Sequence, residues 1–152
     1  MTSPANNASA PGSWLYWLAA LLALVGLCDA LYLTYGHLTG ANLQCTIVHG
    51  CAEVLGSEYA KLGKIPLAAF GAAAYFSAFS LAVLAASGYA KLGKLLALQV
   101  GAMFLVTLYL LYLQAYVIER YCQYCLLSAA VTSCLVVTTN FAWRKSKQNN
   151  LR

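Results

Sequence analysis

The chain has 152 residues and a formal net charge of +5; 62% of its residues are hydrophobic and only 9% are charged. A water-soluble domain of this length lacks the interior volume to bury so much apolar surface, so the composition favours membrane lipid as the solvent. The basic residues lie at the ends of apolar runs rather than on one polar domain, which argues against nucleic acid as a partner.

Residues 1–13 are small and polar and contain no Lys or Arg, a composition typical of a disordered N-terminus. The apolar run at about 14–36 is long for a signal peptide, so we expect it to remain as a transmembrane helix. Three further runs, at about 66–87, 95–117 and 122–143, also reach the ~20 apolar residues that a membrane-crossing helix needs. The sequence therefore predicts an all-α integral membrane protein, with a four-helix membrane domain over residues 14–143.

A long loop, residues 37–65, separates the first two apolar runs. It contains Cys45 and Cys51, with His49 between them. Loops of this length inside a compact domain are often functional. The stretch AEVLGSEYAKLG, residues 52–63, has partial helical periodicity and is predicted to lie on the membrane as an amphipathic segment. His49 is a candidate for proton transfer, although a solvated loop histidine is the simpler interpretation.

The distribution of Lys and Arg predicts the orientation of the chain. If both termini are cytoplasmic, six basic residues face the cytoplasm and three face the outside, as the positive-inside rule requires. The cytoplasmic side then holds Lys91, Lys94, Arg144, Lys145, Lys147 and Arg152, and the outer side holds Lys61, Lys64 and Arg120. Residues 144–152 become a basic cytoplasmic tail, and residues 37–65 become an outer loop.

The fourth apolar run begins with the motif Cys122-Gln123-Tyr124-Cys125. Four spans place this motif on the same membrane face as the loop cysteines, whatever the absolute orientation. A Cys-x-x-Cys motif at a helix N-terminus favours a thiolate at its first cysteine, and two such pairs can exchange disulfides. The pattern predicts a thiol relay. Cys28 and Cys134 lie within spans and are interpreted as packing residues.

A thiol relay in a membrane needs an electron acceptor, and a lipid-soluble quinone is the natural small oxidant. We expect a flat apolar pocket near Cys125, although an ordinary packing stripe is an alternative interpretation of the same aromatic residues. The expected wall is Phe70, Tyr75, Tyr109, Tyr112 and Tyr116. Asp29 lies within the first span, where a carboxylate is costly and often functional. Its alternative role is to form a hydrogen bond, for example with Gln99 or Gln114.

Five elements of the sequence resemble the vitamin K epoxide reductase family in its bacterial form. They are LYLTYGHL at the end of the first span, CTIVHGC in the loop, Ser57, GKIPLAAFG at the start of the second span, and YCQYC at the start of the fourth. The resemblance covers about residues 14–143. The order of the two cysteine pairs distinguishes this family from another four-helix thiol oxidase family, in which the Cys-x-x-Cys motif comes first.

The resemblance implies a role for each residue of the relay. Cys125 matches the cysteine that meets the quinone, and Cys122 matches its partner, which exchanges with the loop. Cys51 matches the loop cysteine that reaches Cys122, and Cys45 matches the one that meets an external thiol protein. Ser57 matches a loop residue whose hydroxyl helps to hold the site.

The resemblance also bears on the substrates. Leu67 and Ala129 stand where animal members place an Asn and a Tyr around the quinone carbonyls, which favours a plain quinone over vitamin K epoxide. Ubiquinone, menaquinone and phylloquinone are all candidates. Many bacterial members carry a fused thioredoxin-like domain; here we expect a separate thioredoxin-like thiol protein on the outer face.

These features predict a membrane oxidoreductase that oxidises a secreted thioredoxin-like protein and reduces a quinone, and so supports disulfide bond formation. We expect it in the cytoplasmic (inner) membrane, with its site facing the periplasm or exterior and with no metal ion. One alternative is a transporter that passes a thiophilic metal ion between cysteine pairs. Another is a structural zinc site formed by Cys122, Cys125, a loop cysteine and His49.

Overall fold

A computed structural model of the chain describes residues 12–40, 45–46, 50–149 and 151. Four long helices account for most of it: α1 (Ser13–Thr39), α3 (Leu67–Ala86), α4 (Ala90–Tyr112) and α5 (Gln123–Asn149). Each is long and apolar enough to cross a membrane. The predicted all-α fold with four transmembrane helices is confirmed. Most of the expected disordered N-terminus, residues 1–11, lies outside the described residues, as does His49.

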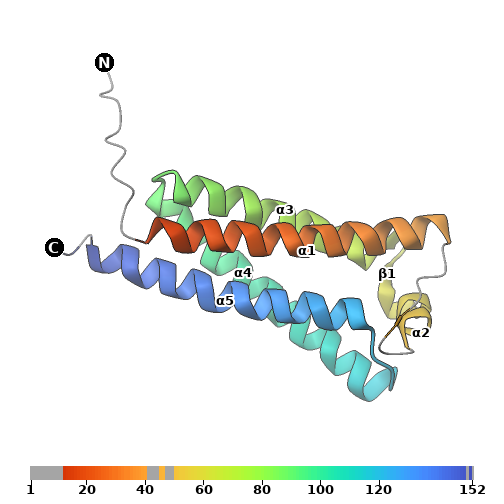
Figure 1. Ribbon diagram of the computed structural model, residues 1–152. Helices are drawn as coiled ribbons and strands as arrows, with labels where there is room; N and C mark the ends of the chain where they lie inside the picture. The colour runs from red at the N-terminus through yellow and green to blue at the C-terminus, as the bar shows by residue number, and fades with distance from the viewer. Residues whose placement is uncertain (1–11, 41–44, 47–49, 150, 152) are drawn as a thin grey trace.

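The four helices run along one another as an elongated bundle. α1 packs against α3 and α5, and α4 packs against the same two helices. The start of α1 and the end of α5 lie at one end of the bundle, and the short helix α2 (Cys51–Gly56) lies at the other (Figure 1). The interior is rich in small residues, which let membrane helices approach closely. Fully buried examples are Ala19, Ala23, Ala78 and Ala82.

Tyr75 crosses the bundle from α3 to α5. Its ring lies over Gly26 of α1, where an added Cβ atom would come within 2.3 Å of the ring, so α1 has no room for a side chain at this position. The Tyr75 hydroxyl donates to the Ser128 carbonyl oxygen at 3.0 Å and lies 2.8 Å from the hydroxyl oxygens of Ser128 and Thr132. This contact joins three helices: α1, α3 and α5.

The long loop between α1 and α3 folds into several short elements rather than one amphipathic segment. α2 ends at Gly56, because the Ser57 hydroxyl donates to the Val54 carbonyl oxygen at 2.7 Å and the Ser57 backbone is extended. A 3-10 turn, η1 (Glu58–Ala60), leads into a hairpin of β1 (Lys61–Leu62) and β2 (Ile65–Pro66). Gly63 makes the turn of the hairpin with a φ of 69°, in the left-handed region that glycine favours.

Helices extend beyond the apolar runs that predict them. α1 continues to Thr39, α4 begins at Ala90, and α5 continues to Asn149, so much of the expected basic tail is helical. Arg, Lys and Gln are good helix formers, so helical hydrogen bonding persists after the hydropathy has fallen. α4 is followed by a π-helical turn, η2 (Leu113–Val117), which leads into the segment before α5.

Candidate redox site and adjoining cavity

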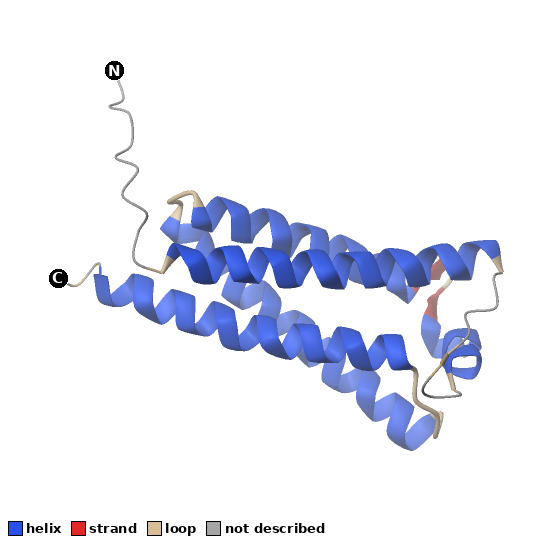
Figure 2. Cartoon of the chain, in the orientation of Figure 1, coloured by secondary structure: helices blue, strands red, loops and turns tan. Residues whose placement is uncertain are grey.

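The loop between α1 and α3 packs directly against the start of α5. Gly50 is buried, and a Cβ atom there would lie 2.6 Å from the Tyr121 carbonyl oxygen, so the two backbones are in close contact. At the surface, Glu53 of α2 forms an ion pair with Arg120 at 2.8 Å. These contacts hold α2 at the end of the bundle where α5 begins (Figure 2). Cys51, the first residue of α2, is thereby brought to Cys122.

All four cysteines of the predicted relay lie in one cluster. Cys51 is 2% exposed and Cys122 is 0% exposed, and Cys45 and Cys125 pack against them. The other members of the cluster are Val54, Leu55, Ile118 and Tyr124. Water is therefore excluded from the junction between Cys51 and Cys122, although the two residues are far apart in the sequence.

The two pairs differ in redox state. Cys45 and Cys51 form a disulfide with Cα atoms 5.9 Å apart, whereas Cys122 and Cys125 are free thiols. Cys28 and Cys134 are also free but lie exposed on the sides of α1 and α5, away from this cluster. They were expected to pack inside the bundle; their helix faces instead point outward, where a small apolar side chain suits lipid.

Cys122 is placed to act as a thiolate. It immediately precedes α5, and its carbonyl oxygen accepts the Leu126 N–H at 3.0 Å, so it occupies the capping position of the helix. Its sulfur accepts hydrogen bonds from the Cys125 side chain and from the backbone N–H groups of Cys125 and Tyr124. Chiefly through the Cys125 side chain, these bonds lower the pKa of Cys122 to about 7, although burial and the Asp29 charge oppose the shift.

Gln114 supports this cysteine pair, and no motif in the sequence identified that role. It is 3% exposed, and its Oε1 atom accepts the backbone N–H of Cys122 at 3.1 Å. The same side chain forms a hydrogen bond with the Cys125 sulfur. Gln114 lies in the π-helical turn, where the Ile118 N–H donates to the Leu113 carbonyl oxygen at 2.8 Å. Such turns recur at functional sites because they redirect side chains.

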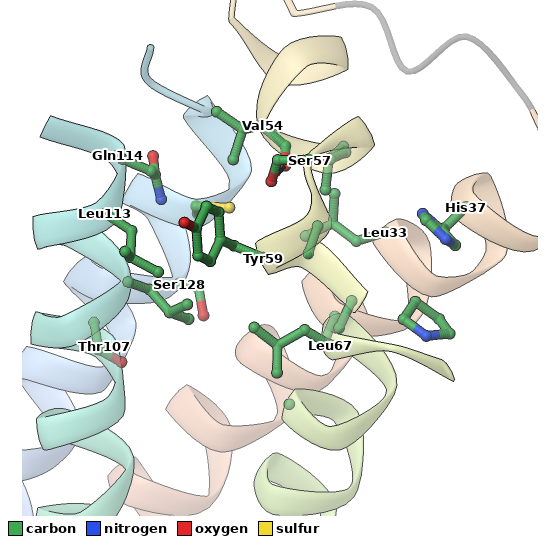
Figure 3. A pocket seen from close by; sticks show the side chains of 18 of the residues that line it. Leu33, His37, Val54, Ser57, Tyr59, Leu67, Thr107, Leu113, Gln114 and Ser128 are labelled. Carbon is green, nitrogen blue, oxygen red and sulfur yellow. Dashed lines mark hydrogen bonds between the residues drawn. The ribbon is translucent and has the colours of Figure 1, made fainter. Parts of the chain in front are cut away.

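A cavity of about 150 Å³ lies beside Cys125. Asp29 of α1, Tyr75 of α3, Gln114 of η2 and Ser128 of α5 supply polar groups to a wall that is otherwise mostly apolar. Figure 3 shows Tyr59 of the loop between α1 and α3, with Leu113 and Gln114 on one side and Leu33 on the other. Ser57 and Val54 cover the cavity from the loop (Figure 3). A mostly apolar cavity with a few converging polar groups is typical of a small-molecule site.

The cavity only partly matches the pocket expected from sequence. Tyr75, Leu67 and Ser57 line it. The cavity wall does not include Phe70, Tyr109, Tyr112, Tyr116 or Ala129. The three tyrosines of the α4–η2 segment do share one face, but that face points away from the bundle, with exposed fractions of 58%, 55% and 74% along the chain. Phe70 is likewise exposed, and Ala129 is buried among neighbouring helices.

The described residues offer little support for a metal site. Within them, no group of three or more His, Cys, Asp or Glu side chains is arranged to hold a metal ion. Two of the four clustered cysteines are already joined to each other. The zinc alternative also requires His49, which lies outside the part of the chain that the structure describes.

The protein-family model described as Vitamin K epoxide reductase family matches residues 17–140 of this chain. The matched segment contains both cysteine pairs and nearly all of the four-helix bundle.

Proposed function

The chain belongs to the vitamin K epoxide reductase family, and from that premise we propose that it oxidises a secreted thioredoxin-like protein and reduces a membrane quinone. Members of this family are membrane thiol and quinone oxidoreductases. One observation carries the proposal: the four cysteines form a single buried cluster, and its last member, Cys125, lines the adjoining cavity. In the cell, this activity would support disulfide bond formation in exported proteins.

Electrons enter at the loop pair. A thiolate of the partner attacks Cys45 of the Cys45–Cys51 disulfide and forms a mixed disulfide with it. The partner's second thiol then attacks the first, so the partner leaves with its own disulfide and Cys45 and Cys51 become thiols. Cys51 next attacks Cys122 of a Cys122–Cys125 disulfide and forms a mixed disulfide, which Cys45 resolves by attacking Cys51. The loop disulfide is restored and the two electrons now reside on Cys122 and Cys125. The Cys45–Cys51 disulfide and the free thiols of Cys122 and Cys125 are compatible with this step.

Electrons leave from Cys125. Its sulfur lines the cavity, where a bound quinone supplies the two-electron acceptor. The Cys125 sulfur loses its proton and bonds to the quinone ring, and Cys122, whose pKa is lowered to about 7, then attacks the Cys125 sulfur as a thiolate. The S–S bond forms, the bond between Cys125 and the quinone breaks, and the electron pair of that bond leaves with the quinol. Gln114 holds both cysteines in position during this step. The proposed acceptor is a plain quinone, such as ubiquinone, menaquinone or phylloquinone, rather than vitamin K epoxide, because Leu67 of the cavity wall stands where animal members of the family place an Asn.

The proposed setting is the cytoplasmic membrane, with both termini in the cytoplasm. The redox site and the two ends of the described chain lie at opposite ends of the bundle, so cytoplasmic termini put the site on the outer face (Figure 1). That face is an oxidising compartment in which disulfides persist and exported proteins acquire them.

The direct test mixes the purified chain with a reduced thioredoxin-like protein and a short-chain quinone, and follows quinol by absorbance. We expect one quinol for each disulfide formed in the partner. Cys51→Ala is expected to stop turnover driven by the partner while leaving quinone binding intact, because it removes the link between loop and helix. Cys125→Ser is expected to abolish quinone reduction, because the sulfur beside the cavity is lost.

Cys28→Ala and Cys134→Ala are the matched controls, since both thiols lie exposed outside the cysteine cluster. Both variants should turn over at the native rate. Quinone reduction at the native rate by Cys125→Ser would show that another group donates the electrons. Failure of the unaltered chain to form any quinol would reject the proposed function as a whole.

A further inference from the structure

Asp29 is an unpaired carboxylate inside a transmembrane helix. It lies within α1 and is 8% exposed, and its Oδ2 atom is buried without a hydrogen-bond partner among the residues that the structure describes. The two amides that the sequence suggested as partners are engaged elsewhere. Gln99 donates to the Ala74 carbonyl oxygen and to the Ser77 hydroxyl, and Gln114 holds Cys122 and Cys125.

The unpaired carboxylate lowers the stability of the fold, which suggests that it has a function. A buried polar atom without a partner destabilises a fold by about 1–3 kcal/mol, and more if the group is charged. No cation among the described residues forms an ion pair with Asp29 to offset that cost. The fold therefore does not account for a carboxylate at this position.

The position of Asp29 indicates what it serves. It lines the cavity together with Cys125 and Ser128, which belong to α5, and with Tyr75. Its charge is also near enough to Cys122 to oppose ionisation of that thiol. A molecule that fills the cavity beside the Cys125 sulfur would therefore share that small space with the Asp29 carboxylate.

Resting on the proposed function, we propose that Asp29 transfers a proton during quinone reduction, from the Cys125 thiol to a quinone oxygen. Closing the Cys122–Cys125 disulfide breaks two S–H bonds, forms one S–S bond and releases two electrons and two protons. The quinone takes up two electrons and two protons and leaves as the quinol. Asp29 accepts the Cys125 proton, passes it to one quinone oxygen and returns to its carboxylate form.

The second proton follows a different route. Cys122 has its pKa lowered to about 7, so its thiol loses its proton before the disulfide closes and needs no acceptor in the cavity. A proton from the aqueous phase reaches the other quinone oxygen. The Cys125 proton is released inside the cavity, away from water. At that position a side chain of the protein, the Asp29 carboxylate, must accept the proton.

Asp29→Asn tests the proposal with little change in size. A positioned proton-transferring group contributes roughly 10²–10⁴-fold to a rate, so we expect a loss of at least about 10²-fold in quinone reduction by the pre-reduced chain. Reduction of the Cys45–Cys51 disulfide by the thioredoxin-like protein, measured without quinone, should not change. Thr139→Val is the matched control: it removes a hydroxyl that is 1% exposed in α5 but does not line the cavity. It should change neither step.

Two further measurements separate proton transfer from a structural role. In Asp29→Ala, the missing carboxyl leaves space, and added formate or acetate should restore quinone reduction in proportion to its concentration. A small acid cannot replace a packing contact. In the unaltered chain, dicyclohexylcarbodiimide, which modifies protonated carboxyls in apolar surroundings, should label Asp29 by mass spectrometry. A short-chain quinone should slow that labelling because it occupies the same cavity.

Each outcome bears on a distinct claim. Quinone reduction at the native rate in Asp29→Asn, or labelling of Asp29 that quinone does not slow, overturns this inference and leaves the proposed function standing. Absence of quinol formation by the unaltered chain overturns the proposed function and this inference with it. The labelling experiment needs no variant, so the inference remains testable even if substitutions at Asp29 prevent folding.

Discussion

Cys122 owes its low pKa to hydrogen bonds, and the largest contribution comes from the Cys125 side chain. Replacing Cys125 by Ala removes that donor, whereas Cys125→Ser keeps a hydroxyl at the same position. We expect the pKa of Cys122 to stay near 7 in Cys125→Ser and to rise in Cys125→Ala. Because the thiolate is the reactive form, a higher pKa moves its formation, and with it the reactivity of Cys122, to higher pH.

The measurement is the pH dependence of the ultraviolet absorbance of the Cys122 thiolate, taken as the difference between each variant and the same variant that also carries Cys122→Ala. Cys28→Ala provides the control, since that thiol lies outside the cluster and its removal should not shift the titration. If the Ser and Ala variants titrate alike, the Cys125 side chain is not the cause, and the backbone N–H groups at the start of α5 must stabilise the thiolate.

For single residues, the sequence predicts the chemical role of a side chain better than it predicts which other side chains that residue contacts. The spacing of the cysteines and the number of spans place both pairs on one face, and the structure brings them into one cluster. The role of Gln114 could not be predicted from spacing. Its position depends on the π-helical turn, in which the Ile118 N–H donates to the Leu113 carbonyl oxygen five residues earlier. Asp29 was recognised as a candidate from its type and depth, but whether its carboxylate is paired depends on the three-dimensional packing.

Among the elements, α2 has the most exacting position, because Gly50 puts its first turn against the backbone of Tyr121. Gly50→Ala would place a Cβ atom 2.6 Å from a carbonyl oxygen that cannot rotate away, so α2 must move. A misplacement of about 1 Å can slow a reaction about 10²-fold, so we expect a loss of this order in disulfide exchange between Cys51 and Cys122. Quinone reduction by chemically pre-reduced Cys122 and Cys125 should persist.

The control is Gly56→Ala, at the other end of α2, where an added Cβ atom meets nothing within 4 Å. Both variants are compared by rapid acid quench and mass spectrometry of the disulfides. Exchange at the native rate in Gly50→Ala would show that the loop reaches Cys122 by movement rather than by docking. The exposed ion pair of Glu53 and Arg120 should matter little, since such pairs contribute at most about 1 kcal/mol.

Helical periodicity shows which residues of an element share a face, but not which neighbour that face meets. Tyr109, Tyr112 and Tyr116 illustrate the difference: they lie on one side of the α4–η2 segment, and the rings of Tyr112 and Tyr116 are 5.1 Å apart. That side faces away from the bundle. Lipid and a protein interior are both apolar, so in a membrane helix hydropathy cannot distinguish them, and the walls of the cavity could not be predicted from α4 alone.

For the whole molecule, four spans place the termini at one end of the bundle and the redox site at the other. Either end could face the cytoplasm, so two orientations in the membrane remain. The charge distribution decides between them. Of nine Lys and Arg residues, six fall on the side of the termini and three on the side of the redox site. On the redox side, Arg120 is already paired with Glu53. By the positive-inside rule, we expect the termini in the cytoplasm and the four cysteines outside.

Reporter fusions test this orientation. Alkaline phosphatase, which folds only outside the cytoplasm, should be inactive after Arg152 and active after Gly63 in the hairpin loop, and green fluorescent protein should show the reverse pattern.

Changing Arg144, Lys145 and Lys147 to Gln leaves three basic residues on each side, so we expect this variant to insert in both orientations and to lose part of its thiol oxidase activity. The matched change of Gln148 to Asn alters no charge and should preserve the native pattern. Phosphatase activity after Arg152 in the unaltered chain would place the redox site in the cytoplasm, where disulfides are rare, and the proposed secreted partner could not reach Cys45.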